Sequence, residues 1–251
     1  MTSVAYGLAF PATRGVLAYH PAGGGFDPTS LFAGDTGGWW DPSDMATLSQ
    51  DSAGTTPVTA ADQPVGRIED KSGNGNHLLQ ATDTRRPVLR NGGALWWLEF
   101  DGVDDFLQAT FTHAQPFTRV TAMQLLSYPS SERMLDGGSA YAETVSQPSD
   151  SIGIGGSAPN IVVAGFTVGN SHVVTEIWDG ASSKLAVDNG TYGTGDPGTD
   201  TPNGLTVGAD HNGSFPPNIL WFGMISMGSV PDSTGIANCR TFFGAKAGLS
   251  L

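Results

Sequence analysis

Two short stretches decide the fold of this chain: "DKSGNGNHLLQ", residues 70–80, and "LEFDGVDDFL", residues 98–107. Each sets a Gly-rich and Asp- or Asn-rich turn beside an apolar segment. In the first, Gly73 and Gly75 can adopt the positive φ that tight turns require, and the neighbouring Asn side chains can bond their own backbone. In the second, an Asp-Gly pair separates two strand-like segments. The first stretch predicts an antiparallel hairpin, and the second predicts a strand, a turn and another strand.

The rest of the chain continues this pattern. Segments rich in β-branched and aromatic residues recur about every ten residues, with turn formers between them. The chain holds 35 Gly and 16 Pro, and only 14% of its residues are charged, which favours short strands over long amphipathic helices. There is no strand–helix–strand alternation. We therefore predict an all-β antiparallel sandwich, with one short helix in the ending "DSTGIANCRTFFGAKAGL".

The charge balance excludes several classes of partner. The net charge is −13, and the 11 basic residues are too scattered to form the stripe that neutralises nucleic-acid phosphates or an anionic membrane. No apolar stretch is long enough to insert into a bilayer, and Pro11 interrupts the apolar run of the N-terminus, so no secretory leader is expected. Neutral glycans and cations remain possible partners. The single Cys239 is expected to be a small buried apolar residue.

Several segments together resemble a known family. "WWDPSDMATL" (residues 39–48), the two stretches quoted above and "SHVVTEIWDGASSKLAVDNG" (residues 171–190) resemble laminin-G-like, concanavalin-A-like jelly-roll domains, which occur in bacteriophage structural proteins and bacterial surface proteins. The resemblance implies two antiparallel sheets packed face to face. We assign residues 31–251 to this domain. Residues 1–30, rich in Gly, Pro and small side chains, are predicted to form an extended arm that packs on a neighbouring subunit.

Glu99, Asp101 and Asp104 are the candidate catalytic carboxylates. Their spacing resembles the E-x-D-x-x-E motif of glucanases with the same broad fold, and paired carboxylates are what glycoside hydrolysis needs. However, the third position is the shorter Asp, and Asp101-Gly102 begins a turn that takes Asp104 off the strand face. We favour a structural turn and predict no catalytic residue.

The same Asp residues could instead bind a cation. Asp101, Asp104 and Asp105 are close in sequence, and Asp70 or Asn74 could join them from a neighbouring loop. Oxygen ligands of this kind suit Ca²⁺. No other cofactor is predicted.

Tryptophan rings are the predicted glycan contacts, because aromatic faces stack on sugar rings. Of the six Trp residues, Trp40, Trp97 and Trp178 are the candidates. Of the adjacent pair Trp96 and Trp97, one should lie in the core and the other should face solvent or a partner.

These observations lead to three hypotheses. The first is a non-catalytic bacteriophage virion protein of the tail, baseplate or head surface. It would be made in the host cytoplasm, exposed on the particle, bound to other virion proteins and to copies of itself, and would contact host surface polysaccharide through its lectin-like domain. The second is a glycoside hydrolase of the same fold that degrades capsule or cell wall through Glu99, Asp101 and Asp104. The third is a cell-surface adhesin module.

Overall fold

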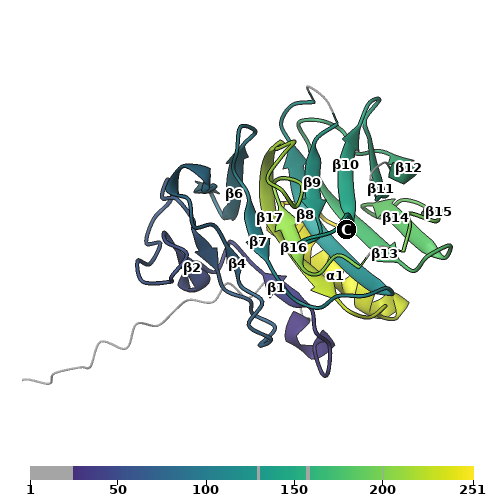
Figure 1. Ribbon diagram of the computed structural model, residues 1–251, viewed down its shortest axis with the longest axis horizontal. Helices are drawn as coiled ribbons and strands as arrows, with labels where there is room; N and C mark the ends of the chain where they lie inside the picture. The colour runs from purple at the N-terminus through teal and green to yellow at the C-terminus, as the bar shows by residue number, and fades with distance from the viewer. Residues whose placement is uncertain (1–24, 129–130, 157–158, 200) are drawn as a thin grey trace, which may run out of the picture.

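The computed structural model describes residues 25–128, 131–156, 159–199 and 201–251. Residues 1–24, most of the predicted arm, lie outside the described residues. In the described part of the chain, seventeen strands form an eight-stranded and a nine-stranded sheet, and one α-helix follows them (Figure 1). This is the predicted all-β sandwich with a short C-terminal helix. Within these ranges, no helix combines the length and the apolar character needed to span a membrane.

The eight-stranded sheet is antiparallel throughout. Its order is β15 (Gly193–Gly195), β14 (Ser183–Val187), β13 (Ser171–Trp178), β8 (Phe117–Leu125), β17 (Asn218–Met227), β6 (Leu95–Asp101) and β5 (Val88–Gly92), and β1 (Gly38–Trp40) also pairs with β17.

The nine-stranded sheet packs against it. Its order is β12 (Pro159–Ala164), β11 (Ser151–Gly155), β10 (Glu143–Gln147), β9 (Arg133–Asp136), β16 (Leu205–Val207), β7 (Leu107–Ala109), β4 (Leu78–Leu79), β3 (Arg67–Ile68) and β2 (Leu48–Ser49). Strands β3 and β4 pair antiparallel and flank the loop 69–77, so the hairpin predicted from the first stretch is present. A 3-10 turn, η1 (Pro28–Leu31), precedes β1, and two more, η2 (Met45–Thr47) and η3 (Asp83–Arg85), lie between strands.

Both faces of the eight-stranded sheet are covered. One face meets the nine-stranded sheet across a core that includes Leu98, Phe117 and Trp221. The other face carries helix α1 (Ser233–Lys246), which lies against β8, β13 and β17 and buries Phe243 with Phe222 of β17. Because side chains of β8 are buried on both faces, eight of its nine residues are buried. The molecule therefore has three layers, and the nine-stranded sheet forms one outer layer.

The segment just before the sandwich also packs on the helix side. Phe26 contacts Phe242 of α1 edge-to-face, with ring centroids 6.2 Å apart. Asp232 caps the start of α1 by accepting a hydrogen bond from the backbone N–H of Gly235 at 2.7 Å. At the other end, Lys246 donates to the buried Asp41 at 2.8 Å. Residues 25–30 thus lie on the same molecule's helix layer.

A charged pair lies inside the sandwich core. Arg119 of β8 and Glu176 of β13 are fully buried, 3.6 Å apart, and point from the eight-stranded sheet toward the nine-stranded sheet. Arg119 donates to the carbonyl oxygen of Ala142 at 2.8 Å, and Glu176 accepts from the hydroxyl of Thr144 and from the indole N–H of Trp178. From the core side of the nine-stranded sheet, the pair therefore bonds to Ala142 and Thr144, the residues on either side of Glu143.

Candidate functional site

The loop 69–77, which holds most of the first quoted stretch, is a structural turn organised by Asp70. Its two carboxylate oxygens accept four hydrogen bonds, two from Ser72 and one each from the backbone N–H groups of Trp39 and Asn76, at 2.8–3.0 Å. An ionised carboxylate has about four lone-pair positions, so none is left for a cation. The Asn74 amide donates to the carbonyl oxygens of Asp35 and Gly37. Asp70 and the amide nitrogen of Asn74 thus hold the turn together, and neither residue belongs to the group of neighbouring carboxylates at Asp101, Asp104 and Asp105.

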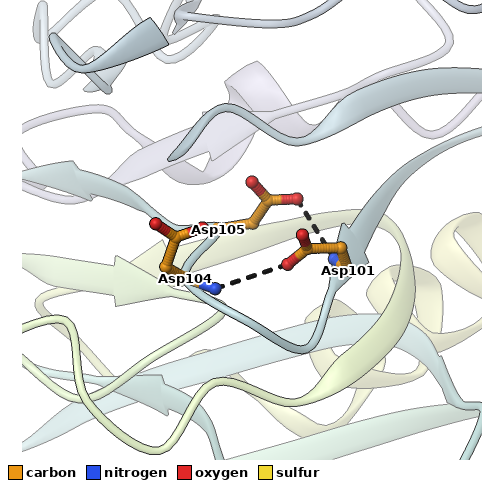
Figure 2. A group of neighbouring side chains, drawn as sticks. All are labelled: Asp101, Asp104 and Asp105. Atoms are coloured by element: carbon orange, nitrogen blue, oxygen red, sulfur yellow. Dashed lines mark hydrogen bonds between the residues drawn. The ribbon is translucent and has the colours of Figure 1, made fainter. Parts of the chain in front are cut away.

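The other three predicted ligands do lie together, at the β6–β7 turn (Figure 2). The carboxylate oxygens of Asp101, Asp104 and Asp105 approach within 4.8 Å of one another. Asp101 accepts from the backbone N–H groups of Val103 and Asp104, and Asp105 accepts from that of Asp101. Burial raises the pKa of Asp105 to about 6, and the negative charges of Asp101 and Asp104 add to the effect. Ca²⁺ binding here stays a prediction.

Glu99 of β6 is held in an ion pair with Arg90. Its neighbours Leu98 and Phe100 point into the inter-sheet core, so Glu99 points to the opposite, helix-side face. There it accepts a hydrogen bond from the Arg90 guanidinium at 2.8 Å. Arg90 also pairs with Asp62. The geometry supports the structural interpretation of this motif.

The predicted tryptophan platform is absent from the positions named. Trp40 and Trp178 are fully buried in the inter-sheet core, where Trp178 stacks on Phe117 with centroids 5.4 Å apart. A buried ring offers no face to a sugar, so these two assignments are corrected. Trp97 is half-buried and packs on Phe222 on the helix side, while Trp96 packs on the inter-sheet core.

Helix α1 lies on the eight-stranded sheet, so the outer face of the nine-stranded sheet carries no helix among the described residues and is here called the open face. Leu107, Leu205 and Leu135 point inward to the core, so the residues that alternate with them along each strand point outward. The outward residues include Gln108 of β7, Thr206 of β16, Asp136 and Arg133 of β9, and Glu143 of β10. These polar side chains form a row across four neighbouring strands, and within it Thr206, Asp136 and Glu143 are each at most 2% exposed.

Glu143 is the unusual member of this row. Its side chain is 2% exposed; Oε1 accepts from the Arg133 guanidinium at 3.1 Å, and Oε2 is buried without a hydrogen-bond partner among the described residues. Burial raises the pKa of Glu143, against the lowering effect of Arg133, and the charges of Asp136 and Asp210 raise it further. Glu143 is a carboxyl group that is biased toward its protonated form.

Asp136 lies at the centre of this row and joins two loops through its hydrogen bonds. It is fully buried and accepts from the backbone N–H groups of Gly137, Ala142 and His211 and from His211 Nδ1, all at 2.7–2.9 Å. These bonds fix the β9–β10 loop to the loop after β16. Gln108 donates to the carbonyl oxygen of His211 at 3.2 Å and to the hydroxyl of Thr206 at 2.9 Å, and this extends the network toward β7.

Two exposed aromatic rings flank the carboxyl groups. Tyr141 is 41% exposed and contacts the His211 ring edge-to-face at 4.7 Å. Phe215 is 53% exposed and lies 4.4 Å from the Arg133 guanidinium. Rings of this kind, with one face in solvent, suit stacking on sugars. Exposed aromatic rings are therefore found on the loops beside Arg133 and His211, whereas Trp40 and Trp178 are buried.

Sequence reasoning missed this site because its parts are far apart along the chain. Asp136 and His211, for example, are separated by 75 residues and meet only through the β9–β16 pairing. One signal was available: Arg133, Asp136 and Glu143 are charges embedded in strand-like segments, and charged side chains are seldom buried in a core unless they are paired.

Comparisons with known proteins support the fold. No family model and no curated protein sequence matches the chain. Among solved structures, Trypanosoma rangeli sialidase aligns over 85% of this chain and 33% of its own, with 14% identity and a TM-score of 0.56. A mutant of GH54 α-L-arabinofuranosidase soaked with 4-nitrophenyl α-L-arabinofuranoside aligns over 88% of this chain and 66% of its own, with 12% identity and a TM-score of 0.61. An arabinofuranosidase complexed with arabinofuranosyl-α-1,2-xylobiose gives a TM-score of 0.62 at 11% identity, over 88% of this chain and 65% of its own.

These neighbours correct the functional prediction. The chain spans about a third of the sialidase, and the shared feature is the β-sandwich fold. The sialidase and the arabinofuranosidases are glycosidases, and none of these neighbours is a virion protein. The prediction of a non-enzymatic bacteriophage component is therefore wrong, and the comparisons favour the glycoside-hydrolase alternative.

Proposed function

We propose that this chain is a glycoside-hydrolysing β-sandwich whose site is the open face around Glu143. The observation that carries the proposal is a single carboxyl group: Glu143 has a raised pKa and an unpartnered Oε2, and it lies among the exposed rings of Tyr141 and Phe215. The D-x-SGNGN and FDG-x-DD motifs support a laminin-G-like variant of the jelly roll.

The residues suit the chemistry of glycoside hydrolysis. The reaction uses one carboxylic acid that protonates the leaving-group oxygen and a second carboxyl group that acts as base or nucleophile. We assign the role of proton donor to Glu143, because burial raises its pKa and its Oε2 has no hydrogen-bond partner among the described residues. Asp210 is the second carboxyl group: it lies close enough to raise the pKa of Glu143, and its Oδ1 is oriented by the backbone N–H groups of Asn212 and Ser214.

The charges favour a neutral substrate. The chain carries a net charge of −13, and Glu143, Asp136 and Asp210 add three carboxyl groups to the site itself. Arg133 is held by Glu143 and Phe215. An anionic sugar such as sialic acid would meet repulsion here, whereas a neutral furanoside or pyranoside would not. Of the two kinds of neighbour, the arabinofuranosidases act on the better-matched class of substrate.

Activity measurements on a panel of 4-nitrophenyl glycosides test the proposal. The panel contains α-L-arabinofuranoside, common neutral pyranosides and a sialoside. We expect turnover of a neutral member, with kcat reduced roughly 10²- to 10⁴-fold in Glu143→Gln. Glu99→Gln is the matched control, since it makes the same chemical change on the helix side.

Thermal unfolding of each variant separates loss of chemistry from loss of fold. Full activity in Glu143→Gln, or loss of activity in a folded Glu99→Gln, would contradict the assignment. Sugar binding without turnover of any glycoside would show a binding domain and would overturn the proposal of hydrolysis.

A further inference from the structure

A pocket at one end of the open face is not used by the proposed chemistry. It has a volume of about 270 Å³ and is lined by the end of the quoted loop and by β7 and the residue after it: Gly75, Asn76, His77, Leu79, Gln108, Ala109 and Thr110. Pockets for drug-sized ligands are usually about 300–1,000 Å³. This one is suited to a single small ring.

His77 presents a defined donor to the pocket. Its Nδ1 accepts a hydrogen bond from the backbone N–H of Asp70 at 3.1 Å, so the neutral ring must carry its proton on Nε2. Asp70 is itself fixed by the four bonds described above. The loop thereby sets both the tautomer and the direction of the imidazole.

Gln108 and Leu79 complete the lining. The Gln108 amide nitrogen is engaged with Thr206, Gly138 and His211, which leaves Oε1 as the end of the side chain outside these bonds. Leu79, paired with Gln108 across β4 and β7, is 38% exposed and supplies an apolar wall. A donor, an acceptor and an apolar wall match the hydroxyl groups and the C–H face of an uncharged sugar.

We propose that this pocket is a second sugar subsite, which binds a neutral glycosyl unit of the same oligosaccharide that Glu143 cleaves. The inference rests on the proposed function. Strands β4, β7, β16, β9 and β10 are consecutive in the sheet, so four strand spacings of about 4.8 Å place the pocket about 19 Å from Glu143. An oligosaccharide lying across the strands spans this distance with several units. Gln108 links the two ends, since it lines the pocket and donates to His211.

The test measures binding without turnover. ¹⁵N-labelled Glu143→Gln protein is titrated with xylo-oligosaccharides of one to six units that carry α-L-arabinofuranosyl branches, and amide and imidazole resonances are followed by NMR. We expect affinity to rise with length and the His77 imidazole signals to shift only with the longer ligands. Leu79→Arg should lower the affinity for the longest ligand at least tenfold and remove the gain with length. Val162→Arg, at a 50% exposed position on β12 of the same sheet, is the control and should keep that gain.

The outcomes separate the subsite from the catalytic proposal. If Glu143→Gln still turns over substrate but length-dependent binding reaches His77, only the catalytic assignment fails. If turnover requires Glu143 but the gain with length survives Leu79→Arg, or the His77 signals stay unmoved, the subsite is overturned. Absence of binding by every oligosaccharide also overturns it.

Discussion

The buried pair Arg119–Glu176 gives the sharpest quantitative prediction. Arg119→Met leaves Glu176 charged, unpaired and fully buried, and Glu176→Gln does the same to Arg119. Breaking a buried ion pair by removing one partner costs about 3–5 kcal/mol. For a domain of this size, that corresponds to a fall in Tm of roughly 6–20 °C.

The double variant Arg119→Met/Glu176→Gln should cost little more than either single variant. It leaves no uncompensated charge, and the amide that replaces Glu176 can still accept from Trp178 and donate to Thr144. We therefore expect an interaction energy of about 3 kcal/mol in a double-mutant cycle.

Guanidinium unfolding of the four proteins measures this energy directly. If the losses in unfolding free energy of the two single variants simply add in the double variant, the idea that the two charges act as one unit is refuted. The same cycle reports on the site, because Arg119 and Glu176 hold Ala142 and Thr144, the residues that flank Glu143. Folded single variants should lose kcat with little change in KM, since they displace the acid and leave the sugar-contacting rings in place.

Three further predictions follow from other parts of the molecule. Cys239 is fully buried and burial raises its pKa to about 12, so a thiol reagent should label it only after denaturation, as mass spectrometry would show. Asp105 has a pKa of about 6 in the folded protein, above the ordinary 3.8, so the wild type, compared with Asp105→Asn, should lose stability as pH rises from about 4 to 6. A difference in Tm between the two proteins that does not change with pH would contradict this. If Asp101 and Asp105 bind Ca²⁺, adding it should offset the loss of stability at pH 7. Gly223 has φ +124° and a Cβ there would lie 2.7 Å from the carbonyl oxygen of Trp40, so Gly223→Ala should cost roughly 1–3 kcal/mol in chemical denaturation.

Much of the fold is readable from local sequence. Turn residues such as Gly73 and Gly102 mark where strands reverse, and both adopt the positive φ that their turns require. The C-terminal helix is visible because its spacing differs from that of the strands. Such signals are local, and they identify elements without saying which strands become neighbours.

The tryptophan assignments show that alternation along a strand does not predict which faces of a sheet are covered. Alternation along a strand separates two faces, and Trp96 and Trp97 do lie on opposite sides. It does not show that both faces of the eight-stranded sheet are covered: the nine-stranded sheet buries Trp40 and Trp178, and helix α1 lies on the face that carries Trp97. The site at Glu143 is likewise formed by pairing between distant strands, which no pattern within a strand encodes.

The three-layer arrangement also determines where this chain can change without unfolding. Substitutions in the eight-stranded sheet meet packed neighbours on both sides, but the nine-stranded sheet has one face with no third layer above it. Randomised libraries confined to exposed positions there, such as Tyr141, Phe215 and Leu79, should yield mostly folded proteins. We therefore expect that new sugar specificities can be selected at these positions while the sequence of the buried eight-stranded sheet is kept unchanged.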